Sequence, residues 1–282
     1  MKIAFCLSGQ LRTWRSCYES WQLLFERFRK KVIINGNTQY SPYVDETFDV
    51  DYFVHTWDFN TLPHYKWDVN WNEPDSHKRR ELLEPFENAY GVVKKEEILE
   101  ILNILKPKKS IIENWEVSKS RKKIMDDIST SQTFDKNHRQ SHISWAGSQL
   151  YSIMKCAHLK REYELENKFE YDLCIRSRFD LNFDENNRMI FARDFEIPQP
   201  RTLYSVHSRA IDKYPFNIIG DILYYSDSQT FDLLSSIYDH MPHIEQSAFH
   251  SGIKIEEVMA YIVRMFQLNN KVTDFAPTVI RD

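Results

Sequence analysis

The chain begins with the near-continuous apolar run Lys2–Leu7, and this run constrains the fold most strongly. Apolar side chains in an unbroken series are typical of a strand covered on both faces, as in the interior of a parallel sheet. Ser8-Gly9-Gln10 follows as a turn, and apolar residues spaced three and four apart from about Trp14 predict a helix. The N-terminal stretch therefore predicts one βα unit.

The same alternation continues along the chain and indicates the fold class. Further strands are predicted at Asp51–His55, Tyr171–Asp180 and Ile218–Tyr225, and further helices at Ala146–Arg161, Phe231–Met241 and Ile255–Phe266. Alternating strands and helices favour an α/β fold with a mostly parallel sheet flanked by helices. A chain of 282 residues can bury one large core, so we expect residues 1–282 to form a single domain.

The stretch from roughly residue 60 to residue 145 has a looser pattern, and we expect a largely helical or irregular insertion or lid there. It opens with an aromatic cluster at Tyr65, Trp67 and Trp71. Within it, Lys106–Arg139 carries nine Lys or Arg residues against five Asp or Glu residues. Such a segment is either a solvated charged face or a contact surface for a polyanion.

Glycine is scarce, with six residues that never cluster. A dinucleotide fingerprint (G-x-G-x-x-G) and a phosphate loop (G-x-x-x-x-G-K-[ST]) both need clustered glycines, so both motifs are excluded. A nucleotide would have to be held mainly by side chains.

The hydropathy and the cysteine pattern predict neither a membrane-spanning segment nor a zinc site. The net charge is −4, and no apolar run approaches the ~20 residues that span a bilayer, so we expect no membrane span. The N-terminus also lacks the pattern of a signal peptide. Cys6, Cys17, Cys156 and Cys174 form no C-x-x-C pair, which favours structural thiols in the cytoplasm over a zinc site.

The strongest candidate site is the run Arg176-Ser-Arg178-Phe-Asp180-Leu-Asn182, which follows an apolar strand. Side chains alternate along a strand, so the four polar residues of this run are expected on one face. Guanidinium groups match phosphate oxygens, and a neighbouring carboxylate can hold a divalent cation. The alternative is an internal Arg–Asp salt bridge that closes the strand end.

Other candidates lie at the remaining strand ends. The Gly9 turn lets backbone approach a ligand, and the helix predicted after it offers N–H groups to an anion. A base could stack on Trp57. The whole set of candidate ligand contacts here is Ser8, Gly9, Gln10, Arg12, Thr56, Trp57, Asp58 and Gln149.

Three acidic residues are candidates for a general base. Asp221 follows a glycine in a strand-like region, whereas Glu256 and Glu257 open the clearest amphipathic helix. Acidic residues are also favoured in a first helical turn by the helix dipole alone, so the two glutamates have a structural alternative.

In this order, the motifs resemble those of GT-A-like, Rossmann-related nucleotide-sugar glycosyltransferases from bacterial surface-glycan loci and tailed phages. The resembling stretches are Met1–Trp14, Asp51–Asp58, Gln149–Ala157, Tyr171–Asp180, Gly220–Ser226 and Glu256–Tyr261. The group often has Asp-Gln-Phe where this chain has Asp221-Ile-Leu.

The resemblance implies a glycosyltransferase that moves arabinose or a hexose from a UDP-sugar to an acceptor hydroxyl. It implies that Asp180 contacts Mg²⁺ or Mn²⁺ or the diphosphate, beside Arg176 and Arg178. It also implies that Ser8, Gly9 and Arg12 line the nucleotide and diphosphate, and that Trp57 and Asp58 line the base. If the reaction inverts, Asp221, Glu256 or Glu257 is the base.

The phage branch implies one acceptor, 5-hydroxymethylcytosine in double-stranded DNA, modified in the host cytoplasm. The basic stretch would then contact phosphates, and the aromatic cluster would stack or wedge at a flipped base. The alternatives are a glycosyltransferase acting on lipopolysaccharide or capsule glycan, a non-catalytic nucleotide-sugar-binding module, and a nucleotidyltransferase.

Overall fold

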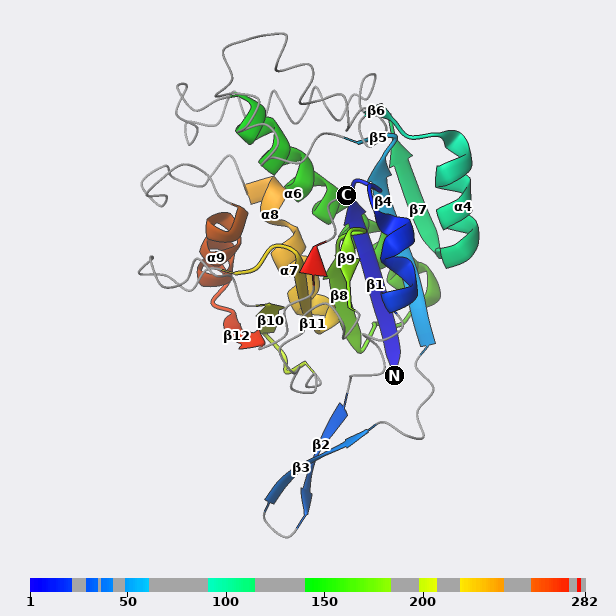
Figure 1. Ribbon diagram of the computed structural model, residues 1–282. Helices are drawn as coiled ribbons and strands as arrows, with labels where there is room; N and C mark the ends of the chain where they lie inside the picture. Colours follow the sequence, from blue (N-terminus) through cyan, green and yellow to red (C-terminus); the bar gives the residue numbers. More distant parts are fainter. Residues whose placement is uncertain are drawn as a thin grey trace.

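A seven-stranded sheet forms the centre of the computed structural model, with strand order β12-β10-β11-β8-β1-β4-β7 (Figure 1). The structure describes residues 1–21, 29–34, 37–42, 49–60, 91–114, 140–183, 198–206, 219–240, 255–273 and 278–279. The strands of this sheet are β1 (Lys2–Gly9), β4 (Asp49–Trp57), β7 (Lys109–Glu113), β8 (Leu173–Ser177), β10 (Thr202–Val206), β11 (Leu223–Ser226) and β12 (Asn269–Thr273).

The sheet is mixed but mostly parallel. β1 pairs in parallel with β4 on one side and with β8 on the other. β7 pairs in parallel with β4, and β12 with β10. Within this sheet only β11 runs the other way, antiparallel to both β8 and β10. The expected α/β class with a mostly parallel sheet is therefore confirmed.

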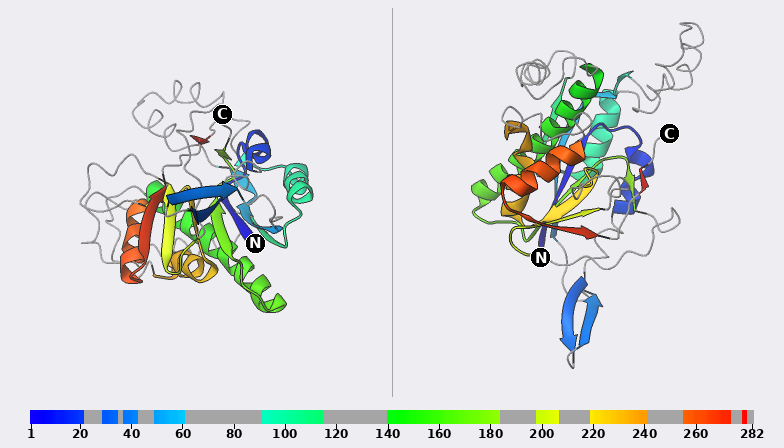
Figure 2. Two further views of the ribbon diagram at one scale, coloured as in Figure 1. Left: turned by 90° about the horizontal axis from the view of Figure 1, so that it is seen from below. Right: turned by 90° about the vertical axis from the view of Figure 1, so that its left-hand side faces the viewer.

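One face of the sheet is covered by four helices (Figure 2). They are α6 (Gln140–Asn167), α7 (Ser228–Ser235), α8 (Ile237–His240) and α9 (Ile255–Met265). Ala4 and Cys6 of β1 belong to the apolar core on this face.

The opposite face carries the alternate side chains of β1, because successive residues of a strand point to opposite sides. Phe5 meets Trp21 edge to face there, and both belong to a buried apolar core that includes Trp14 and Ile101 of α4 (Lys95–Leu105). Both faces of β1 are thus buried, as its unbroken apolar run predicted.

The helix expected from about Trp14 begins differently. Two short 3₁₀ helices, η1 (Trp14–Ser16) and η2 (Tyr18–Ser20), follow the β1 turn, and residues 22–28 lie outside the described part. Asn182, expected beside Arg176, donates instead to the backbone oxygen of Ser16.

Three two-stranded sheets complete the described strands. They pair β2 (Arg29–Ile34) with β3 (Asn37–Pro42), β5 (Phe59–Asn60) with β6 (Gly91–Val92), and β9 (Leu181–Asn182) with β13 (Thr278–Val279). The β2–β3 hairpin projects away from the main sheet (Figure 1).

Part of the stretch expected to be an insertion belongs to the main sheet. β7 lies within it and is the edge strand beside β4, while α4 contributes to the core. β7 and α4 are therefore part of the main fold and not of an insertion. The aromatic cluster Tyr65, Trp67 and Trp71, and most of Lys106–Arg139, lie outside the described residues.

The cysteines and the helices agree with two further expectations. Cys6, Cys17, Cys156 and Cys174 are all buried free thiols. In the described ranges, no helix has both the length and the apolar character needed to cross a membrane.

A buried charge cluster joins α6 to α7. The fully buried ammonium of Lys160 lies 2.9 Å from Glu164 Oε2, 2.8 Å from Asp232 Oδ1 and 2.5 Å from Ser228 Oγ. Burial alone lowers the pKa of Lys160, but the neighbouring anionic groups outweigh burial and raise that pKa above its ordinary value. Lys160 is therefore charged and holds the start of α7 against α6.

We expect Lys160→Met to lower the free energy of unfolding by about 3–5 kcal/mol, because it leaves buried carboxylates without their cation. Urea denaturation measures this change. Lys95→Met, at an exposed position of α4, is the matched control and is expected to change stability by less than about 0.5 kcal/mol. Equal stability of the two variants would contradict this role for Lys160.

Candidate functional site

Four strand ends meet at one edge of the sheet. Because β1, β4 and β8 are parallel, their carboxyl ends lie together, and ligands of open α/β sheets bind at such an edge. β11 runs the opposite way, and its first residue, Leu223, pairs with Ser177 at the end of β8. Asp221, two residues earlier, therefore comes to the same edge.

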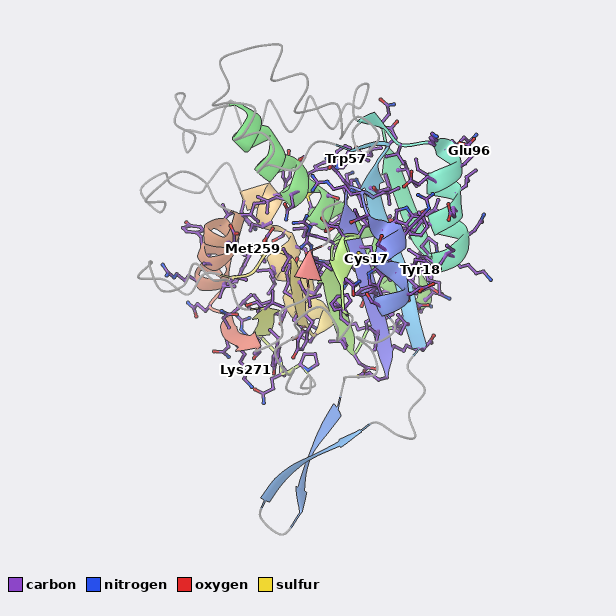
Figure 3. All side chains as sticks on the ribbon, viewed as in Figure 1. Cys17, Tyr18, Trp57, Glu96, Met259 and Lys271 are labelled. Carbon is purple, nitrogen blue, oxygen red and sulfur yellow. The ribbon has the colours of Figure 1, made fainter. Side chains whose placement is uncertain are left out.

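A cavity of about 50 Å³ opens at this edge, beside the end of β4 where Figure 3 labels Trp57. This space is enough for a few water molecules. The residues that line it are Ser8, Gly9, Gln10, Arg12, Trp57, Ser148, Gln149, Arg176, Arg178 and Asp180. The structure thus brings together nine residues that the sequence indicated, and adds Ser148.

The turn after β1 places Arg12 at the cavity. Gly9 has φ +124°, a conformation that side chains oppose and that glycine adopts readily. Arg12 itself has a positive φ of 34°, which is uncommon for a residue with a side chain and is found often at functional sites. Its Nε donates to Gln10 Oε1 at 2.9 Å, which fixes the direction of the guanidinium.

Arg176 is the most deeply buried cation of the site, with 1% of its surface exposed. Its Nε donates to Ser8 Oγ at 3.4 Å, and its Nη1 donates to the backbone oxygen of Asp221. Burial lowers the pKa of this guanidinium, but an arginine stays protonated. Among the described residues, no carboxylate lies within ion-pair distance (4.0 Å) of Arg176.

Arg178 and Asp180 form the internal salt bridge that was the alternative interpretation of this run. Arg178 Nε donates to Asp180 Oδ1 at 2.8 Å, and Arg178 Nη2 donates to Oδ2 at 2.5 Å. Arg12 Nη1 lies 3.9 Å from Asp180 Oδ2. Burial alone lowers the pKa of Arg178, yet the charge of Asp180 outweighs it and raises that pKa. The salt bridge and the cavity thus share the same residues.

Gln149 connects α6 to Asp221. Its Nε2 donates to Asp221 Oδ2 at 2.5 Å, and Asp221 is nearly buried. Gly220 permits this placement, because a Cβ atom there would lie 2.6 Å from the backbone oxygen of Val206. Asp221 is therefore held beside the cavity through a residue that lines it.

Trp57 is held by an aromatic cluster rather than standing free. Its ring stacks on Tyr151 of α6 at 5.8 Å between centroids, and His55 meets it edge to face at 5.3 Å. His55 Nδ1 lies 2.7 Å from Ser152 Oγ, and His55 Nε2 lies 3.5 Å from Glu113 Oε1. Burial lowers the pKa of His55.

Other predicted site residues lie outside this cavity lining. Thr56 is buried, and its hydroxyl points to the backbone oxygen of Trp57. Asp58 accepts a hydrogen bond of 2.6 Å from Asn114 Nδ2. Glu256 is half-buried at the start of α9, whereas the side chain of Glu257 lies outside the described part.

The donor set of the site does not fit a divalent cation. Both oxygens of Asp180 already accept from Arg178, and the neighbouring lining residues Arg12 and Arg176 are cations. Nowhere in the described ranges do three His, Cys, Asp or Glu residues gather in a way that could hold a metal. The cationic lining suits an anion better than a cation.

Comparisons with known proteins add no family to this geometry. Neither the protein-family models nor the curated protein sequences contain a match to the chain.

We expect stability to fall as the pH drops through about 6.5, because His55 then gains a proton in the unfolded chain but resists it in the fold. The loss is at most about 1.4 kcal/mol per pH unit for one group. Comparing urea denaturation at pH 7 and pH 5 measures it.

His55→Gln should flatten this decline, since it removes the titrating group. His158→Gln is the control, because His158 is exposed on α6. If His55→Gln has the same pH dependence as the wild type, the decline has another source.

Proposed function

We propose that the chain is a glycosyltransferase with a GT-A-like, Rossmann-related domain that transfers a sugar from a UDP-sugar to an acceptor hydroxyl. In this reaction the bond between the anomeric carbon and the diphosphate oxygen breaks, a bond to the acceptor oxygen forms, and UDP leaves. The negative charge that develops on the leaving diphosphate has to be stabilised by cationic or hydrogen-bonding groups.

The observation that carries this proposal is the buried guanidinium of Arg176. A buried charge is costly unless it is paired, and the hydrogen-bond partners of Arg176 are neutral oxygens. The charge of Asp221 partly offsets the burial that lowers the pKa of Arg176, although its carboxylate is not within ion-pair distance. Arg12 and Arg178 line the same cavity, and each side chain is 14% exposed. Three guanidinium groups around a cavity at the carboxyl edge of a parallel sheet suit a diphosphate.

We favour Asp221 as the base, because Gln149, which lines the cavity, donates to its carboxylate. It lies one hydrogen bond from the cavity through Gln149. In an inverting transfer its carboxylate would accept the proton of the acceptor hydroxyl.

The acceptor we favour is 5-hydroxymethylcytosine in DNA. This choice rests on the resemblance of the sequence motifs to the phage branch. Lipopolysaccharide or capsule glycan is the second acceptor class. Either acceptor presents a hydroxyl, so the arginine cavity serves both.

We expect Arg176→Met and Arg12→Met each to weaken UDP binding by roughly tenfold to a hundredfold, since each removes charge-assisted hydrogen bonds to phosphate. Isothermal titration calorimetry measures this affinity. Arg15→Met is the matched control, because Arg15 is half exposed and pairs with Glu97 and Glu100 instead. Arg12→Met covers the case in which the buried Arg176 variant fails to fold. Unchanged UDP affinity in folded variants would contradict the proposed site.

We expect the wild type to transfer label from a radioactive UDP-sugar to hydroxymethylated DNA, and Asp221→Asn to lose about 10²–10⁴-fold in rate while still binding UDP. Asp239→Asn, an exposed position of α8, is the control. Transfer to an oligosaccharide and not to DNA would show that the acceptor is a glycan rather than 5-hydroxymethylcytosine. UDP-sugar binding without turnover on any acceptor would indicate a binding module, and release of pyrophosphate from a nucleoside triphosphate would indicate a nucleotidyltransferase.

A further inference from the structure

We infer that the Asp180 carboxylate is a built-in competitor for the arginine cavity, so that a diphosphate, whose second phosphate group reaches Arg176, displaces it more readily than a single phosphate does. This inference rests on the proposed function for the identity of the ligand and deepens it by assigning selectivity to one residue. It also replaces the metal-binding role that the sequence resemblance implied for Asp180.

The geometry of the salt bridge supplies the first argument. Asp180 engages the Nε and Nη2 atoms of Arg178, which form the edge of a guanidinium that also binds phosphate oxygens in pairs. The same carboxylate lines the cavity and lies 3.9 Å from Arg12. A carboxylate therefore occupies the position between two arginines where a phosphate group would bind.

Charge supplies the second argument. Asp180 is only 2% exposed, so little water separates its charge from a ligand in the cavity. A phosphate brought to Arg12 and Arg178 in this arrangement would lie against a carboxylate of the same sign, which is strongly unfavourable where solvent is excluded. Binding therefore requires the Asp180 side chain to leave Arg178.

The tether supplies the third argument. Asp180 follows Arg178 by two residues, so the carboxylate stays at a high effective concentration beside the guanidinium. A single phosphate group competes with it poorly. A diphosphate competes better, because its second phosphate gains Arg176, which Asp180 leaves without an ion pair among the described residues.

The test measures binding of inorganic pyrophosphate, inorganic phosphate and UDP to the full chain by calorimetry without added metal. We expect the wild type to bind pyrophosphate at least roughly tenfold more tightly than phosphate. We expect Asp180→Asn to bind both probes more tightly, phosphate by roughly tenfold or more, so that the preference for pyrophosphate shrinks.

Two further variants separate the competing charge from other effects. Asp180→Glu keeps the charge, so it should keep the preference for pyrophosphate over phosphate. Asp172→Asn removes an equal charge from an exposed residue before β8, at the other end of that strand. It should leave both affinities unchanged, which controls for the change in net charge.

Each outcome decides the inference. The inference is supported if Asp180→Asn binds phosphate more tightly and Asp172→Asn does not. Weaker pyrophosphate binding by Asp180→Asn overturns the inference and restores a ligand-binding role for Asp180. If Asp180→Asn does not fold, the wild type alone remains decisive, because equal affinity for phosphate and pyrophosphate overturns the inference. If the wild type transfers sugar but does not prefer pyrophosphate to phosphate, the inference fails and the proposed function stands. If the wild type neither transfers sugar nor binds UDP, both the inference and the proposed function fail.

Discussion

The parallel pairing of β1 with β4 and β8 is the constraint on which the site depends. It requires β1 to be apolar on both faces, because helices cover one side and the η1–η2 segment with α4 covers the other. It also places the ends of the three strands at a single edge. The polar residues that follow each strand are then neighbours, although as many as 168 positions separate Ser8 from Arg176.

The sequence predicted this centre because the pattern there is local. An unbroken apolar run identifies β1, and polar residues directly after an apolar strand identify Arg176, Arg178 and Asp180. The sequence did not predict β7, because its short run Lys-Ser-Ile-Ile-Glu lies in a basic stretch. It is an edge strand of the sheet and lacks the long apolar run of a central strand.

Contacts between distant elements were beyond a sequence pattern. Gln149 was indicated as a ligand contact, but its hydrogen bond to Asp221 joins residues 72 positions apart and depends on how α6 packs. The same packing stacks Tyr151 on Trp57, so one face of the tryptophan is already covered. The Ser152–His55–Glu113 contacts likewise arise only when α6, β4 and β7 meet.

Charge in the cavity is unevenly balanced, and this imbalance links the fold to the proposed reaction. Arg178 has its carboxylate, while Arg176 is buried against neutral oxygens.

A crystal structure with UDP bound tests this account most directly. We expect both phosphates to lie about 2.7–2.9 Å from guanidinium nitrogens of Arg12, Arg176 and Arg178. UDP bound elsewhere at saturating concentration, with no phosphate at these arginines, would contradict it.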